Sequence, residues 1–324
     1  MARRWLGSLS PVLDVAVAPL LVPCALAMKF VRRHGVYRLP LCKRLLESVG
    51  VFPILDHYHE PLWNGSRLRR SLREDRPLPG VDLNVDGQLA RLRQFQYADE
   101  LRRLPLERPA GPAPSFYYHN GAFESGDAEY FYSMIRLHKP STIIEVGAGH
   151  STLLARAAIG GNEAEERGYR CAHICIEPYE NPWLEQCGVD VIREPLERVD
   201  WRLFSRLSRN DMLFIDSSHV VAPQGDVVSA FLEILPTLAS GVLVHLHDIF
   251  TPKDYPDEWV RTDAKLWTEQ YLLEAFLTHN NAFAVIGALN YLAHHHSRLL
   301  GEKCPVFQSE SAVREPGSFW IMKR

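Results

Sequence analysis

Short apolar runs alternate with longer amphipathic segments in the C-terminal two thirds of the chain. An apolar run bounded by glycine or polar residues is typical of a buried parallel strand, and the amphipathic segments predict covering helices. The predicted strands are 142–146, 172–176, 189–193, 212–215, 242–246, 282–289 and 318–322. The predicted helices are 127–138, 151–159, 196–207, 226–238 and 263–278. This alternation predicts an α/β fold that ends in two strands with no predicted helix between them.

The first part of the chain has a different pattern, rich in arginine, proline and leucine. Residues 109–115 read PAGPAPS, which is typical of a linker. We therefore expect a mostly helical N-terminal extension over residues 1–110 and a separate domain over residues 115–324. Basic runs such as 67–70 predict a solvated helix face, and binding to anionic lipid headgroups is the alternative.

An apolar stretch at residues 11–28 has basic residues on both flanks. It approaches the ~20 residues that cross a bilayer, but it contains Asp14, Pro19 and Pro23. The pattern favours a helix that packs on the protein or lies at a membrane surface, and a true span is the alternative. Positive charge on both flanks specifies no orientation, and no clear cleavage site marks a signal peptide.

Composition narrows the class of protein. A hydrophobic content of 46% and a charged content of 23% are ordinary for a globular protein, and a net charge of −3 argues against a nucleic-acid partner. The six cysteines form no CxxC pair and suggest no disulfide framework. We expect a cytoplasmic protein, and attachment to the inner face of a membrane through residues 11–28 remains open.

The predicted first strand ends in Glu145-Val146-Gly147-Ala148-Gly149, and Ser151 and Thr152 open the next predicted helix. Glycine allows a sharp turn and the close approach of a ligand, and the helix start offers free N–H groups. A dinucleotide fingerprint requires a third glycine near the helix, which is absent here. The turn therefore argues against an NAD-dependent dehydrogenase.

The Glu-x-Gly-x-Gly pattern resembles motif I of the class I S-adenosylmethionine (SAM) methyltransferases. The resemblance implies a Rossmann-like sheet of order 3-2-1-4-5-7-6 with the last strand antiparallel, and SAM as the cofactor. Glu177 follows the second strand, where a carboxylate can accept two hydrogen bonds from a ribose diol; the alternative is a surface glutamate. The cofactor-binding residues that we expect are Glu145, Gly147, Gly149, Ser151, Thr152, Glu177 and Asp216.

Polar residues also follow the predicted strands 212–215 and 242–246. Ligands of open α/β sheets bind at the carboxyl ends of the strands, so these groups should converge. We predict four catalytic residues: Asp216, His219, His247 and Asp248. They could hold a divalent cation that orients and acidifies a substrate hydroxyl, or an imidazole could remove the proton directly.

The Asp-x-x-His and His-Asp pair resembles a branch that includes metal-dependent and metal-independent O-methyltransferases. A third carboxylate ligand is not evident, and His247 would be a poor ligand for Mg²⁺. We therefore assign no metal ligands, and a Mg²⁺-dependent mechanism stays the less favoured alternative. His245 lies further inside its strand and is predicted to be a core residue, and residues 294–296 are predicted to be an exposed polar turn rather than a metal site.

Three further segments carry functional groups. Residues 116–127 suit either a lid over the cofactor or a packed linker. Residues 56–61 suit either a second wall of the substrate site or a polar turn. Residues 255–259 follow the fifth strand and suit acceptor recognition.

Taken together, the residues and the resemblance predict a SAM-dependent methyltransferase that transfers a methyl group to an oxygen of a small-molecule, sugar or lipid-linked acceptor. The alternatives are a metal-dependent, hydroxylase-like enzyme on the same scaffold and a non-catalytic scaffold protein. N-methylation stays open, but residues 216–219 read Asp-Ser-Ser-His, unlike the Asn/Asp-Pro-Pro-Tyr/Phe motif of nucleic-acid and protein amino methyltransferases. The sequence leaves the oligomeric state undetermined.

Overall fold

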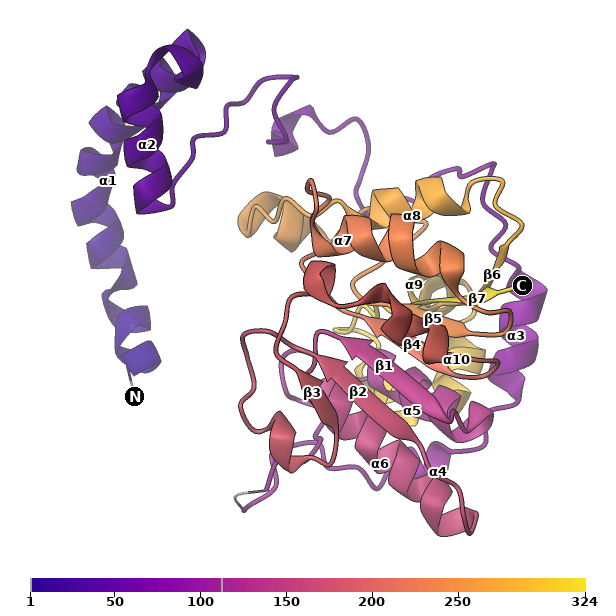
Figure 1. The fold of residues 1–324 in the computed structure, drawn as a ribbon. Helices are drawn as coiled ribbons and strands as arrows, with labels where there is room; N and C mark the ends of the chain where they lie inside the picture. Colours follow the sequence, from indigo (N-terminus) through magenta and orange to yellow (C-terminus); the bar gives the residue numbers. More distant parts are fainter. Residues whose placement is uncertain (1, 112) are drawn as a thin grey trace. The chain divides into compact units, whose positions relative to one another are not determined.

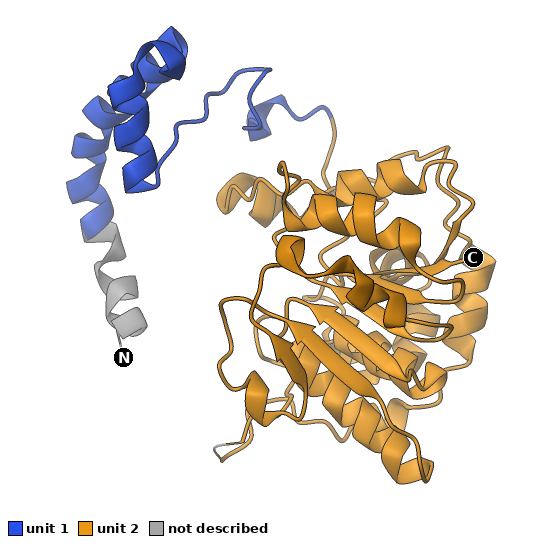
Figure 2. Cartoon of the chain, in the orientation of Figure 1, with its two compact units in different colours: residues 1–69 blue, residues 70–324 orange. Residues whose placement is uncertain are grey.

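The computed structural model describes residues 2–111 and 113–324, with side chains from residue 13 onward. The chain divides into two compact units, Met1–Arg69 and Arg70–Arg324 (Figure 2). Each unit is described by itself below.

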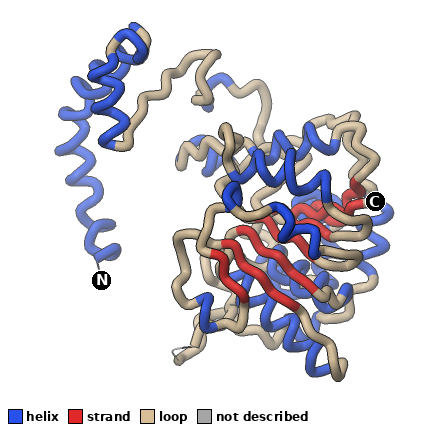
Figure 3. Tube along the Cα trace, viewed as in Figure 1, coloured by secondary structure: helices blue, strands red, loops and turns tan. Residues whose placement is uncertain are grey.

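The first unit is helical, as Figure 3 shows. It contains α1 (Ala2–His34), α2 (Pro40–Val49) and the short 3₁₀ turns Val36–Arg38 and Gly65–Arg67. The segment Leu13–His34 is long and apolar enough to cross a membrane, the one such helix among the described residues. Length and composition alone are weak evidence, because signal sequences and buried core helices meet the same criteria.

The second unit is built on a seven-stranded sheet of order β3-β2-β1-β4-β5-β7-β6 (Figure 1). The first five strands run parallel, and β7 is antiparallel to both β5 and β6. This confirms the predicted sheet order and the predicted antiparallel last strand. The strands are β1 (Thr142–Val146), β2 (Ala172–Ile176), β3 (Asp190–Ile192), β4 (Met212–Ile215), β5 (Leu243–Leu246), β6 (Phe283–Ala288) and β7 (Phe319–Lys323).

Helices cover both faces of the sheet and bury a hydrophobic cluster on each. On one face lie α5 (Asp127–His138) and α6 (His150–Glu165); on the other lie α7 (Asp226–Ser229) and α8 (Glu269–Leu277). The insertion between β6 and β7 contains α9 (Leu289–His295), α10 (Ser297–Lys303) and α11 (Pro305–Glu310). Residues 294–296, which the sequence predicts to form an exposed polar turn, therefore lie at the end of α9. Nε2 of His295 lies 2.6 Å from a carboxylate oxygen of Asp75.

Three predicted helices are shorter or more irregular than expected. Residues 196–207 form two 3₁₀ helices, Leu196–Arg198 and Trp201–Arg206, and residues 230–237 continue α7 as a π turn and a 3₁₀ turn. Pro236 lacks the N–H that a regular helix needs there. The helix predicted at 263–278 begins only at Glu269, because the N–H groups of residues 268 and 269 donate to the carbonyl oxygen of His219.

Residues 70–110 pack with the sheet, and the second unit begins before the linker expected at 109–115. Helices α3 (Val85–Arg93) and α4 (Ala98–Leu101) supply the fully buried Leu92 and Leu101. Arg76 pairs with Glu274 of α8, and its guanidinium also lies 3.2 Å from Asp254. Arg76 lies in a segment that the sequence assigns to the N-terminal extension, and its ion pairs tie this segment to the sheet unit.

Asp211 fastens the start of β4 to the start of β1. Its buried carboxylate accepts hydrogen bonds from the N–H and hydroxyl of Ser141, the N–H of Thr142, and the N–H and hydroxyl of Ser208, all at 2.8–2.9 Å. We predict that Asp211→Ala lowers the free energy of unfolding by about 3 kcal/mol, because it leaves buried donors unpaired. Denaturant unfolding followed by circular dichroism measures this.

The matched control is Asp190→Ala, which removes an exposed carboxylate at the start of β3. It should change the unfolding free energy by no more than about 0.5 kcal/mol. Equal losses in both variants would mean that Asp211 has no special role in the sheet.

Candidate functional site

The glycine turn after β1 lies against the end of β4. Gly147 has φ +77°, and a Cβ at this position would lie 1.8 Å from the carbonyl oxygen of Asp216. The N–H of Asp216 donates to the carbonyl oxygen of Val146 at 2.8 Å, which holds the two strand ends together. Only glycine satisfies both the left-handed backbone and this close approach.

Glu145 lies beneath the turn and is completely buried. Its carboxylate accepts hydrogen bonds from Ser151 at 2.5 Å and from Thr152 at 2.6 Å, and it lies 3.1 Å from Nε2 of His173. The Thr152 hydroxyl also accepts the N–H of Gly149 at 3.1 Å. In this arrangement Glu145, Ser151 and Thr152 brace the turn against the first turn of α6.

A cavity of about 470 Å³ opens at the carboxyl ends of the parallel strands. Three of the predicted site residues line it: Gly147, Glu177 and Asp216. Leu196 and Ala222 add apolar surface to the lining. Glu145, Gly149, Ser151 and Thr152 do not line this cavity.

Glu177 is held at the cavity wall by backbone groups. One carboxylate oxygen accepts the N–H groups of Tyr179 and Glu180 at 3.0 and 2.9 Å, and the other accepts that of Ala148 at 3.3 Å. An ionised carboxylate has about four lone-pair sites, so Glu177 can still accept a hydrogen bond from a ligand hydroxyl. An oriented acid and apolar lining in one cavity fit the ribose and base of SAM.

The four predicted catalytic residues lie together beside this cavity. Nε2 of His219 lies 3.2 Å from Asp216 and 3.6 Å from Asp248, and Nε2 of His247 lies 3.6 Å from the other oxygen of Asp248. His219 and Asp248 both have positive φ, at +60° and +58°. Strained non-glycine backbone of this kind clusters at functional sites. Asp216 also lines the cavity and so connects the two groups.

Glu269 is a member of this cluster that sequence reasoning missed. It lies at the start of α8 and is almost fully buried. A carboxylate oxygen of Glu269 lies at hydrogen-bond distance, 2.8 Å, from Nδ1 of His219. The sequence gives little signal for this role, because residues 268–270 lie in the middle of the helix predicted over 263–278. The Trp267 ring lies 4.2 Å from the His219 ring and covers its other side.

Burial and neighbouring charges set the protonation of the cluster. Burial alone would lower the pKa of His219, but hydrogen bonds to Asp216 and Glu269 raise it well above the usual value of 6.5. Burial opposes the charged form of His247 too, and the nearby Asp248, Asp216 and Asp127 raise its pKa. The neighbouring carboxylates thus favour the charged form of both imidazoles against the effect of burial.

The two carboxylates differ. Burial favours the neutral form of Asp216, yet His247 and the hydrogen bond to His219 bring its pKa below the usual value. Its side chain keeps 36% of its surface exposed, so solvent screens part of these effects. Burial raises the pKa of Asp248, and the charge of His247 offsets this only in part.

The other predicted segments divide between structural and open roles. His245 is a core residue, as predicted: it is fully buried, stacks on Phe214 and lies 2.8 Å from the hydroxyl of Ser318. Among residues 255–259, Tyr255 is buried and its hydroxyl accepts the N–H of Gln270. Residues 56–61 belong to the first unit, where Asp56 pairs with Arg67.

Residues 116–127 are well packed rather than open. His119 lies between two carboxylates, 2.7 Å from Glu107 and 2.6 Å from Glu310. Asp127 is buried and accepts the N–H groups of residues 317 and 318. This segment therefore has the contacts expected of a packed linker.

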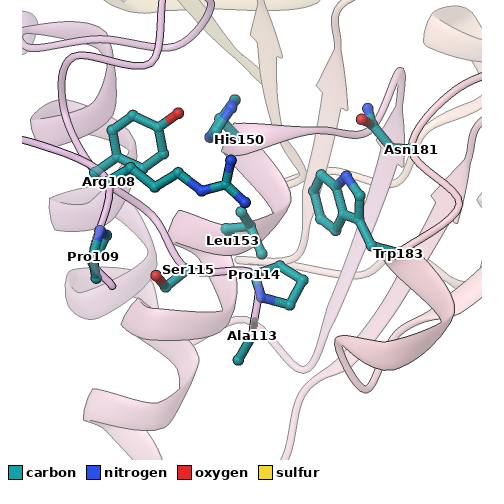
Figure 4. Close-up of a pocket in the computed structure, with 10 residues that line it drawn as sticks. Arg108, Pro109, Ala113, Pro114, Ser115, His150, Leu153, Asn181 and Trp183 are labelled. Atoms are coloured by element: carbon teal, nitrogen blue, oxygen red, sulfur yellow. The ribbon is translucent and has the colours of Figure 1, made fainter. Parts of the chain in front are cut away.

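A second cavity of about 240 Å³ lies at the first turn of α6 (Figure 4). Its lining includes His150, Asn181 and Trp183, together with Arg108 and Tyr117. It shares no lining residue with the larger cavity, but the Asn181 amide donates to the carbonyl oxygen of Ala148 in the glycine turn.

Comparison with known proteins identifies the region around the larger cavity. Residues 144–249 match the family model of a methyltransferase domain. An uncharacterised protein from Archaeoglobus fulgidus is 29% identical over 168 residues, which cover 48% of this chain and 73% of that protein. The matched domain includes the carboxyl ends of β1, β2, β4 and β5, where the predicted site residues lie.

Among solved structures, an O-methyltransferase from Bacillus cereus in complex with SAH is similar over 72% of this chain and 91% of that chain. The two share 11% sequence identity, with a TM-score of 0.36.

The glycine turn generates a prediction that separates folding from ligand binding. Gly147→Ala should lower both thermal stability and SAM affinity, because its Cβ would collide with the backbone of Asp216. Gly149→Ala should leave thermal stability unchanged. The nearest atom to a Cβ at this position would be the side-chain nitrogen of Asn181 at 3.5 Å, an ordinary van der Waals contact. If Gly149 contacts the cofactor, this second variant should still weaken SAM binding in calorimetric titration. Unchanged stability in Gly147→Ala would contradict the geometry.

Replacing Glu269 tests the electrostatics of His219. Because the folded-state pKa of His219 is raised, its charged form contributes stability that is complete below pH 6.5 and is lost as pH rises through the raised value. Glu269→Gln should lower the His219 pKa and weaken this pH dependence. Histidine NMR titration measures the first effect, and Glu258→Gln, an exposed carboxylate, is the control. An unmoved His219 pKa would exclude the predicted coupling.

Proposed function

The chain carries a class I SAM-dependent methyltransferase domain, as its sequence predicted, and we propose that it methylates an oxygen atom of a small-molecule, sugar or lipid-linked acceptor. SAM is the cofactor. The observation that carries the proposal is the position of Asp216, which lines the cofactor-sized cavity and also contacts the buried His219 beside Asp248.

We assign the cofactor contacts to the cavity side of this arrangement. Glu177 would accept from the ribose hydroxyls, and Gly147 would allow the cofactor to pass close to the backbone. SAM supplies an activated methyl group when bound. Because the transfer is an in-line displacement at carbon, most of the rate enhancement would come from positioning the donor and the acceptor.

Asp248 is our candidate for the group that takes the acceptor proton. Burial raises the pKa of Asp248, which makes it a better base than an ordinary carboxylate. His219 is less suited to this role, since both of its ring nitrogens face carboxylates. In this assignment Asp216, His219 and His247 orient Asp248 and balance its charge.

A divalent cation is the second candidate for the same chemistry. Asp216, His219 and Asp248 offer ligand atoms within 4.8 Å of one another. Glu269 at the far nitrogen of His219 resembles the outer carboxylate that orients metal-bound histidines. The donor set therefore fits a cation, which would polarise an acceptor hydroxyl and favour its ionised form. A hydroxylase-like reaction would use the same three residues.

The proposal includes a location. The sheet unit has the composition and burial of a soluble domain, and we place it in the cytoplasm at the inner face of a membrane. The negative net charge favours a small-molecule acceptor over a nucleic acid.

Two variants test the assignment of roles. Glu177→Gln should weaken SAM binding roughly 10-fold or more, because it removes a charged acceptor from the ribose diol. Asp248→Asn should leave SAM affinity within about twofold and lower turnover roughly 100-fold, the scale typical of a lost general base. Calorimetry measures binding, and transfer of labelled methyl from SAM to a panel of hydroxyl compounds, sugars and a lipid extract measures turnover.

The same assay decides between the two candidates. Full activity after treatment with a chelator would exclude a catalytic cation. Loss of activity that added Mg²⁺ or Mn²⁺ restores would favour the cation-assisted mechanism over proton removal by Asp248. A product in which mass spectrometry places the labelled methyl group on a nitrogen atom would overturn O-methylation. Failure of folded protein to bind SAM would remove the whole proposal.

A further inference from the structure

The helical first unit carries apolar surface that its own side chains leave uncovered. Along α1, the side chains of Val15, Leu20, Leu21, Val22 and Leu26 are all more than half exposed. At 100° per residue they point to all sides of the helix. A helix that lies in a membrane surface needs a polar face, and this one has none between residues 15 and 28. Its pattern therefore fits a span better than a surface helix.

The length of this segment agrees with a span. The 22 residues Leu13–His34 extend about 33 Å at ~1.5 Å per residue, close to the ~30 Å hydrocarbon thickness of a bilayer. Asp14 lies at one end, and Lys29 and Arg32 lie toward the other, where long side chains can reach the headgroups. Pro19 and Pro23 are tolerated in such helices.

Helix α2 has the opposite character, with one apolar face and one polar face. Leu41, Leu45 and Val49 are spaced four residues apart, so they share a face, and they are 73%, 64% and 68% exposed. Lys43 and Arg44 lie on the other side of the helix. This is the pattern of a helix that lies in the plane of a membrane surface.

Arg32 connects the two elements. Its guanidinium forms two hydrogen bonds with Glu60, at 2.8 and 2.7 Å, and lies 5.1 Å from the centre of the Phe52 ring. The chain that leaves α2 is thus tied to the end of α1.

Cations are concentrated on this side of α1. Six follow its apolar segment within a few turns: Lys29, Arg32, Arg33, Arg38, Lys43 and Arg44; two, Arg3 and Arg4, precede it. Basic residues on both flanks fix no orientation by themselves, but the larger number on this side favours this end of a span facing the cytoplasm. Basic residues next to a membrane surface also attract anionic lipid, by ~1 kcal/mol each.

From these observations we propose a two-part membrane anchor in residues 13–52. Helix α1 crosses the bilayer, and α2 lies on its cytoplasmic surface with Leu41, Leu45 and Val49 among the acyl chains and its cations at anionic headgroups. The proposal extends the cytoplasmic location given above for the methyltransferase unit. It places that unit where it can reach an acceptor dissolved in, or bound to, the inner leaflet.

The test measures the depth of the α2 face in the full chain. An environment-sensitive fluorophore is attached at Leu45→Cys or, as the matched control on the polar face, at Glu47→Cys, after the exposed and half-buried native cysteines are replaced by serine. Each protein is reconstituted into vesicles of phosphatidylcholine alone or with phosphatidylglycerol. At position 45 we expect blue-shifted emission and quenching by spin-labelled lipid, stronger with the anionic lipid; at position 47 we expect emission typical of water.

Equal, water-like emission at both positions would overturn the role of α2. Shielding at position 45 that is the same without vesicles, in protein that is oligomeric in detergent, would also overturn it and assign the face to a second copy. Protease digestion of inverted and right-side-out bacterial membrane vesicles tests the orientation, and cleavage of the sheet unit only in right-side-out vesicles would contradict it. SAM titration of each labelled sample shows separately whether the methyltransferase assignment holds.

Discussion

The site depends on one close approach, between the glycine turn after β1 and the backbone that follows β4. With no Cβ at Gly147, the carbonyl oxygen of Asp216 can occupy space that any other residue would fill. This allows the ends of two neighbouring strands to meet, and it points the Asp216 side chain toward the cavity that Gly147 and Glu177 also line. Below the turn, the Glu145 carboxylate holds the hydroxyls of α6 in place.

Beside this junction the protein concentrates charge in a buried position. His219 lies between Asp216 and Glu269, and Asp248 lies between His219 and His247. A carboxylate in this position is costly to bury unless it is paired, so the two imidazoles, whose pKa values are raised, help to offset the burial of the acids. The arrangement leaves Asp248 with a raised pKa and Asp216 with a lowered one, which gives two similar carboxylates different chemistry.

The two units of the chain follow different physical rules. In the sheet unit apolar residues are buried on both faces of the sheet, and polar residues collect at the strand ends. In the helical unit, apolar residues such as Leu20 and Leu45 stay exposed. A lipid environment would account for this difference, because each Å² of apolar surface that lipid removes from water stabilises the protein by ~25 cal/mol.

The sequence by itself determined the strands, because short buried strands leave continuous apolar runs, and the resemblance to the class I methyltransferases predicted their order. It also predicted the cluster of Asp216, His219 and Asp248, since parallel strands end at a common edge. Tertiary structure alone decided the role of Glu269, whose contact with His219 joins residues 50 positions apart in the chain. It likewise decided where α8 begins, because the carbonyl of His219 captures the N–H groups that would have extended that helix. Local patterns cannot reveal such partners, because they report which face of an element is buried and not what lies against it.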